Sequence, residues 1–201
     1  MTVDRTTRGR IVAAAVALFA EQGYDATSVN EIVQKAAVAK GALYHHFASK
    51  DDLLYEVYRE LVDRQLAGMK KIQALNLPPA ETLRELIRDM VVSTAESAAE
   101  AKVFFREGHR LTDSNQARVR RSRRTIHDTF IRLVRDAQAD NVFAQVASAE
   151  MVTFTIFGVI NELPIWYRAN GPKRPEAIAE ELSGLILAAL GTQTNHAKNN
   201  A

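Results

Sequence analysis

The chain has 201 residues, of which 47% are hydrophobic and 25% charged, so it is long and apolar enough to fold around a sizeable core. It contains no cysteine, which excludes disulfides, thiolate zinc sites and cysteine nucleophiles, and its net charge of +2 is too small to indicate nucleic-acid binding by itself. The longest apolar run, 151–160, is shorter than the roughly 20 residues of a membrane span. With no signal-peptide pattern at its start, we expect a soluble, cytoplasmic protein.

Apolar residues recur at helical spacing along the whole chain, and no strand-like alternation is present. The first stripe covers 11–22 and is followed by Gly23, which suits a helix end that needs a positive φ. Ser28 and Glu31 have the spacing of a capping box, which predicts a short second helix. A third short helix is expected from about Lys40 to Phe47.

Ser49 with Asp52 predicts the cap of a fourth helix, and the prolines after Asn76 mark the next break. Further helices are expected at roughly 80–98, 100–111, 115–139, 144–168 and 175–190. The sequence therefore predicts an all-α fold of about nine helices. We expect it to divide into a small N-terminal domain at 1–50, a larger helical domain at 51–191 and a polar tail at 192–201.

Two short helices behind a longer one form a helix-turn-helix, and the second has the right length to enter a major groove. Its expected core residues are Leu43 and Phe47, whereas His46 suits either the core or DNA. The residues expected to face the groove are Lys40, Gly41, Ala42, Tyr44 and His45. Ser28 and Lys50 lie at helix starts, where they are well placed for phosphates.

Three segments, Thr27–Ile32, Val38–Phe47 and Ser49–Leu53, resemble the signature of the TetR family of regulators, over roughly residues 8–55. The resemblance implies that 1–50 is a DNA-binding domain and 51–191 a ligand-binding and dimerisation domain. It also implies phosphate contacts for Ser28 and Lys50 and groove contacts for the five residues above. Val29 matches a position that sometimes reads a base, and as valine it would make an apolar contact, for example with a thymine methyl.

Two residues depart from the family pattern. Ala37 stands where the family usually has glycine in the turn, and Ala39 where it usually has a serine N-cap. Alanine at positive φ costs on the order of 1 kcal/mol, and a lost cap oxygen costs a similar amount.

The family usually dimerises through its last two helices, here about 146–168 and 175–190, packed as a four-helix bundle. Residues 151–160 are apolar nearly all round, which is typical of a helix buried on two sides. We therefore expect a homodimer that binds a palindromic operator and is released by a small apolar or acyl-CoA-like effector. Activation is the less usual alternative to repression.

An effector pocket is expected between the middle helices, without a metal or cofactor. Each candidate suits an ordinary core as well, but the set of aromatic and methionine side chains favours an apolar or aromatic ligand. The candidate lining residues are Met90, Phe104, Phe105, His109, Arg123, Phe130, Met151, Phe154 and Trp166.

Ten basic and three acidic residues occupy 101–135, the most basic stretch of the chain. On a helical wheel the other arginines of Arg118–Arg124 spread over a solvated face, but Arg123 projects into the apolar sector. Arg123 is expected either to pair with Glu107 or another buried acid, or to recognise an anionic ligand group.

The segment Trp166–Pro172 is similar to a stretch in TetR regulators that respond to acyl-CoA thioesters, which implies such an effector. The helix before it, 151–167, has no lysine or arginine for the CoA phosphates. Two other functions are less consistent with the sequence. An enzyme is disfavoured because the common nucleotide-binding, hydrolase and metalloprotease motifs are missing. A helical adaptor that binds no DNA leaves the exposed Lys40, Tyr44 and His45 unexplained.

Overall fold

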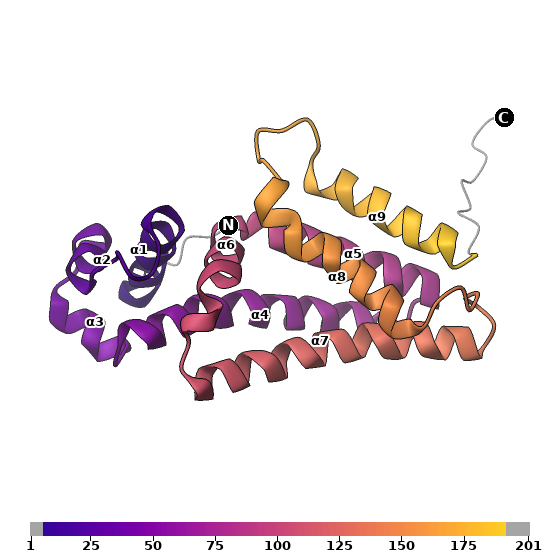
Figure 1. Cartoon of the computed structure of the whole chain (residues 1–201), viewed down its shortest axis with the longest axis horizontal. Helices are drawn as coiled ribbons and strands as arrows, with labels where there is room; N and C mark the ends of the chain where they lie inside the picture. The colour runs from indigo at the N-terminus through magenta and orange to yellow at the C-terminus, as the bar shows by residue number, and fades with distance from the viewer. Residues whose placement is uncertain (1–5, 192–201) are drawn as a thin grey trace. The chain divides into compact units, whose positions relative to one another are not determined.

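The computed structural model describes residues 6–191, and within that range the chain is helical without any strand, as the sequence predicts (Figure 1). The elements are α1 (Thr7–Gln22), α2 (Val29–Ala36), α3 (Lys40–His46), α4 (Lys50–Ala74), α5 (Pro79–Glu96), α6 (Ala98–Glu107), the 3-10 turn η1 (Gly108–Arg110), α7 (Asp113–Ala139), α8 (Ala149–Trp166) and α9 (Pro175–Ala189). The predicted tail at 192–201 lies outside the described residues.

The described chain forms two compact units, and the boundaries fall inside α4 and α7 and before the last residue of α5. Of the described residues, the first unit contains 6–64 together with Glu96–Arg123. The second contains Gln65–Ala95 and 124–191. The expected division into functional domains at residue 50 stays a prediction.

Local sequence signals account for the ends of the first helices. The Thr6 hydroxyl accepts a hydrogen bond from Gly9 N at 3.1 Å and caps α1, and Gly23 ends this helix with a φ of 92°. The predicted capping box is present at α2, where Glu31 N donates to the Ser28 hydroxyl at 3.2 Å and Ser28 N donates to the Glu31 carboxylate at 2.7 Å. Each of these contacts satisfies a group that the helix itself leaves without a partner.

The turn between α2 and α3 has the two expected weaknesses. Ala37 adopts the left-handed conformation with a φ of 53°, and Ala39 occupies the N-cap position of α3 without a side-chain hydrogen bond. The helix is held by its core face instead, because Leu43 and Phe47 are buried as predicted. α1, α2 and α3 pack against one another around these side chains (Figure 1).

The rest of the first unit supports these three helices from two sides. Ser49 caps the predicted start of α4 by accepting from Asp52 N at 3.0 Å. Arg8 of α1 forms ion pairs with the α4 carboxylates of Glu56 and Glu60. α6 also packs on α1.

The second unit has an apolar core made by α5, α7, α8 and α9. Phe130 of α7 is fully buried, and its ring meets Phe157 of α8 edge-on at 5.0 Å between centroids. The buried residues of α5 are Leu83, Leu86, Ile87, Met90, Val91 and Thr94.

Two predicted helix boundaries are wrong for identifiable reasons. The helix expected at 144–168 begins at Ala149, because the Ser148 hydroxyl caps it by accepting from Met151 N, while Ala144 N donates to Leu190 O beyond α9. The helix expected at 100–111 ends at Glu107 and continues as the 3-10 turn η1. Among the described residues no helix is long and apolar enough to cross a membrane.

Candidate DNA-binding and ligand-binding sites

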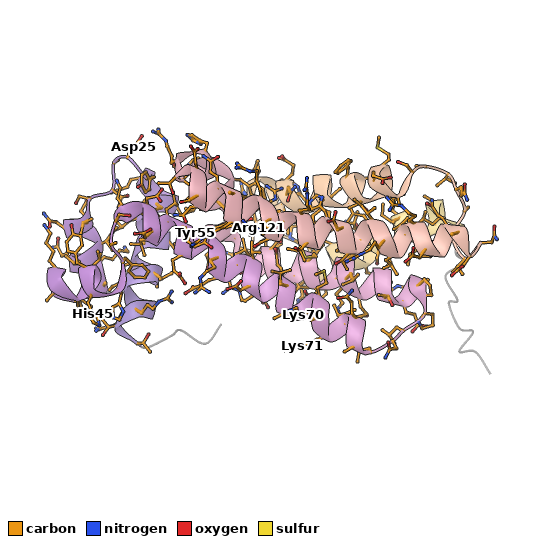
Figure 2. The ribbon with its side chains drawn as sticks, turned by 90° about the horizontal axis from the view of Figure 1, so that it is seen from below. Asp25, His45, Tyr55, Lys70, Lys71 and Arg121 are labelled. Atoms are coloured by element: carbon orange, nitrogen blue, oxygen red, sulfur yellow. The ribbon has the colours of Figure 1, made fainter. Side chains whose placement is uncertain are left out.

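The recognition candidates of α3 form the exposed side of an amphipathic helix. Lys40, Gly41, Tyr44 and His45 are exposed and Ala42 is half-buried, with the Tyr44 side chain at 50% of its full exposure. Figure 2 labels His45 on the unit that carries α1, α2 and α3, and this residue is exposed. The side that could meet a base edge is therefore largely uncovered by the rest of its unit.

Gly41 has no structural reason to be glycine in the isolated chain. A Cβ built at this position meets no atom within 4 Å, and the residue lies in an ordinary helix. Glycine in a helix lowers stability relative to alanine, so its presence at an exposed position points to a requirement outside the chain.

Ser28 and Val29 lie at the start of α2, where the helix dipole favours an anion. Ser28 is exposed and Val29 is half-buried. Hydrogen bonds from the Ser28 backbone, and then from side chains of Ser28 and Gln22, hold the pKa of Glu31 below its usual value. The ionised Glu31 therefore keeps the capping box closed at neutral pH.

Lys50 is half-buried and bonded to backbone oxygens, unlike a fully exposed lysine that contacts only phosphate. Its Nζ donates to Tyr24 O at 2.8 Å and Thr27 O at 2.9 Å, and it lies 4.1 Å from the centroid of the Tyr24 ring. An ammonium group has three donors, so one N–H remains for a phosphate. Lys50 thus ties the turn before α2 to the start of α4.

His46, which the sequence left undecided, is exposed. Its ring contacts those of His45 and Phe47, at centroid distances of 5.1 and 6.3 Å. His46 therefore belongs with the outward-facing residues of α3. Its exposure depends on how α3 packs on α1 and α2, which the sequence alone does not show.

The predicted ligand residues are divided between the two units. The first unit contains Phe104, Phe105, His109 and Arg123, and the second contains the other five. Met90 and Phe130 are buried in the second unit's core, whereas Met151, Phe154 and Trp166 are about half exposed on α8. The pocket as a set stays a prediction.

Arg123 does not pair with Glu107, so that alternative is wrong. Glu107 accepts from Arg106 Nε at 2.8 Å and from Tyr24 N at 3.3 Å. Among residues 6–191, Arg123 forms no ion pair, and its guanidinium carbon lies 5.6 Å from the centroid of the Phe104 ring.

α8 and α9 present exposed apolar side chains that the rest of residues 6–191 does not cover. On α8 the exposed apolar face contains Met151, Phe154 and Gly158, spaced as one side of a helix, and on α9 it contains Gly184 and Leu185. Leu185 is 68% exposed, and a Cβ on either glycine would meet no atom within 4 Å. Large apolar side chains exposed together on two neighbouring helices are typical of a protein–protein interface.

Two family models match the chain. Residues 11–57 match the bacterial regulatory proteins of the tetR family, and residues 76–190 match the tetracyclin repressor-like C-terminal domain.

Individual proteins resemble the chain over nearly its whole length. The HTH-type transcriptional repressor KstR2 of Mycolicibacterium smegmatis is 25% identical over 184 residues, which cover 91% of this chain and 90% of the repressor. The crystal structure of the TetR family regulator PfmR from Thermus thermophilus is 28% identical with a TM-score of 0.82, covering 89% of this chain and 97% of PfmR. AibR in complex with isovaleryl coenzyme A and operator DNA is 21% identical with a TM-score of 0.79, over 90% and 97% of the two chains, and shares the fold. Since the C-terminal model alone covers more than half of the sequence, the chain belongs to the tetR family of bacterial regulatory proteins.

Proposed function

We propose that this regulator reads its operator with the outward side of α3, where Lys40, Gly41, Ala42, Tyr44 and His45 meet the major groove. The observation that carries the proposal is the division of this short helix into a buried apolar side and a bare polar side, with Tyr44 half exposed next to a fully buried Leu43. A helix of this length with its N-terminal residues exposed suits base contacts in a major groove.

The phosphates on either side of the groove are assigned to Ser28 and Lys50, and Val29 is assigned an apolar base contact. Ser28 and Val29 lie at the N-terminus of α2, and the remaining N–H of Lys50 can donate to a phosphate oxygen. These contacts would fix how deep α3 enters the groove.

The protein is a ligand-responsive transcriptional repressor that binds operator DNA as a dimer, as members of its family do, and it is not an enzyme. We assign the dimer interface to the exposed apolar face of α8 and α9. A two-fold dimer presents two recognition helices to half-sites about one turn of DNA apart, which matches a palindromic operator. Because operator DNA lies in the bacterial cytoplasm, we place the protein there.

The effector is proposed to be a small apolar or acyl-CoA-like molecule. The Trp166–Pro172 segment supports this, and AibR, a neighbour in fold, is described in complex with isovaleryl coenzyme A. Such a ligand binds more tightly to the conformation in which the two recognition helices are wrongly spaced for DNA. It lowers operator affinity by the ratio of its affinities for that conformation and for the DNA-binding one. Acyl-CoAs titrated into the protein–operator complex should release the DNA, and no release by any acyl-CoA would exclude this class.

The DNA-binding proposal is tested by selecting bound sequences from random or genomic DNA with the full-length protein. We expect a palindromic consensus whose binding weakens steeply as salt concentration rises, because phosphate contacts release counterions. Recovery of no common sequence would contradict recognition by α3.

A further inference from the structure

The Tyr58 hydroxyl of α4 is buried without a partner. The side chain is 4% exposed, and among the described residues no group forms a hydrogen bond with its oxygen. A buried hydroxyl without a partner is destabilising, and most proteins avoid it, so its presence calls for an explanation.

The Phe104 ring of α6 covers this tyrosine. The two ring centroids are 3.9 Å apart, and the Phe104 ring also lies against Gly108, where a Cβ would come within 3.1 Å of Phe104 Cε2. The surrounding gap leaves no room for a water molecule and is lined by Leu54, Val57, Tyr58, Val103, Phe104, Gly108 and Leu111. Water therefore cannot satisfy the hydroxyl while Phe104 occupies this position.

Arg123 of α7 lies over the same ring. Its guanidinium carbon is 5.6 Å from the Phe104 centroid, and it is half-buried without an acidic partner among residues 6–191. Burial raises the pKa of Tyr58, and the positive charge of Arg123 partly opposes that rise. The Phe104 ring thus lies next to two groups that have no partner of their own among the described residues. The Tyr58 hydroxyl lacks a hydrogen-bond acceptor, and the Arg123 guanidinium lacks an acidic partner.

We propose that the space between α4 and α6 is a latent binding site for a small apolar carboxylate, which displaces the Phe104 ring. The ligand's apolar body takes the place of the ring, while its carboxylate accepts hydrogen bonds from the Tyr58 hydroxyl and the Arg123 guanidinium. Charge-assisted bonds of this kind favour a carboxylate over a neutral ligand. The inference rests on the proposed function, since it identifies the chemistry of one class of effector.

A ligand at this position would act on the helix that holds α1. Arg106 of α6 donates to Phe19 O at the end of α1, and Glu107 accepts from Tyr24 N in the turn that follows. Moving α6 to admit a ligand strains these two contacts, so ligand binding and the position of the DNA-binding helices are coupled within one unit.

The test uses full-length protein without DNA, with phenylacetate and hexanoate as probes and phenylacetamide as the neutral counterpart. Isothermal calorimetry should detect binding of a carboxylate and at least about tenfold weaker binding of phenylacetamide. Tyr58→Phe and Arg123→Gln should each weaken carboxylate binding about tenfold. Arg124→Gln, at the exposed neighbouring position, should leave binding unchanged.

Two further variants separate this site from a binding site elsewhere. Phe104→Ala opens the gap in advance and should strengthen carboxylate binding several-fold, because the cost of displacing the ring is removed. Tyr58→Phe should keep or raise the melting temperature, since its hydroxyl has no partner to lose.

The proposal is overturned if neither carboxylate binds the wild type or Phe104→Ala, or if Tyr58→Phe and Arg123→Gln bind like the wild type. Equal binding of phenylacetamide would overturn the anionic part of the site. Operator binding is measured separately by fluorescence anisotropy without ligand, so a failed calorimetry experiment leaves the DNA-binding proposal standing.

Discussion

Substituting alanine for Gly41 tests whether glycine is needed at this position for folding or for DNA binding. The new methyl group meets no atom within 4 Å, so it introduces no clash in the free protein. Alanine is favoured over glycine in helices by up to about 1 kcal/mol. In a domain of this size that gain raises the melting temperature by about 2–4 °C.

The same substitution should weaken operator binding. If the backbone of α3 approaches the groove at Gly41, an added methyl group at a close contact costs about 1–3 kcal/mol, which corresponds to a loss of affinity of roughly 5-fold to 150-fold. The assays are thermal unfolding and fluorescence anisotropy with a labelled operator, with Gln73→Ala as a control at an exposed position outside α3. Operator affinity within about twofold of the wild type would refute close approach at this residue.

Three further substitutions test other parts of the account. Ala39→Ser should supply the missing cap of α3 and raise the melting temperature by about 2–4 °C without abolishing operator binding; an unchanged or lower value counts against the cap geometry. Leu185→Glu should convert the dimer into a folded monomer with weak operator binding, seen by light scattering after gel filtration, and a persistent dimer would place the interface elsewhere. Burial raises the pKa of Asp89, assisted by Glu85 and opposed by Lys71, so the ionised form destabilises the fold once pH exceeds the unfolded pKa. Asp89→Asn should therefore melt at a higher temperature than the wild type at neutral pH, with the difference disappearing as pH falls through the carboxyl range.

The features that the sequence predicted correctly depend on residues close together in the chain. Ser28 and Glu31 are three residues apart, and their capping box needs no information from the rest of the fold. The positive φ at Gly23 and the burial of Leu43 and Phe47 follow in the same way from local spacing. Most of the exposed side of α3 could therefore be named before any coordinates, apart from His46, which the sequence left undecided, and Ala42, which is half-buried.

The ligand residues could not be predicted in this way, because which side of a helix is covered depends on its neighbours. α8 is apolar nearly all round, so its sequence does not distinguish buried Phe157 from exposed Phe154. The position of Arg123 against Phe104, and of Glu107 with Arg106, depends on contacts between α6 and α7 or within α6. The unpartnered Tyr58 hydroxyl has no sequence signal, since tyrosine at that position looks like ordinary core.

Recognition of operator DNA by the bare side of α3 is tested most directly by the dissociation constant of Tyr44→Ala for the selected operator. Tyr44 is half exposed and packs little within the chain, so its loss should leave the melting temperature nearly unchanged. We expect an operator affinity about tenfold to a hundredfold below that of the wild type at the same salt concentration. A Tyr44→Ala protein that folds normally and binds the operator as tightly as the wild type would contradict this recognition.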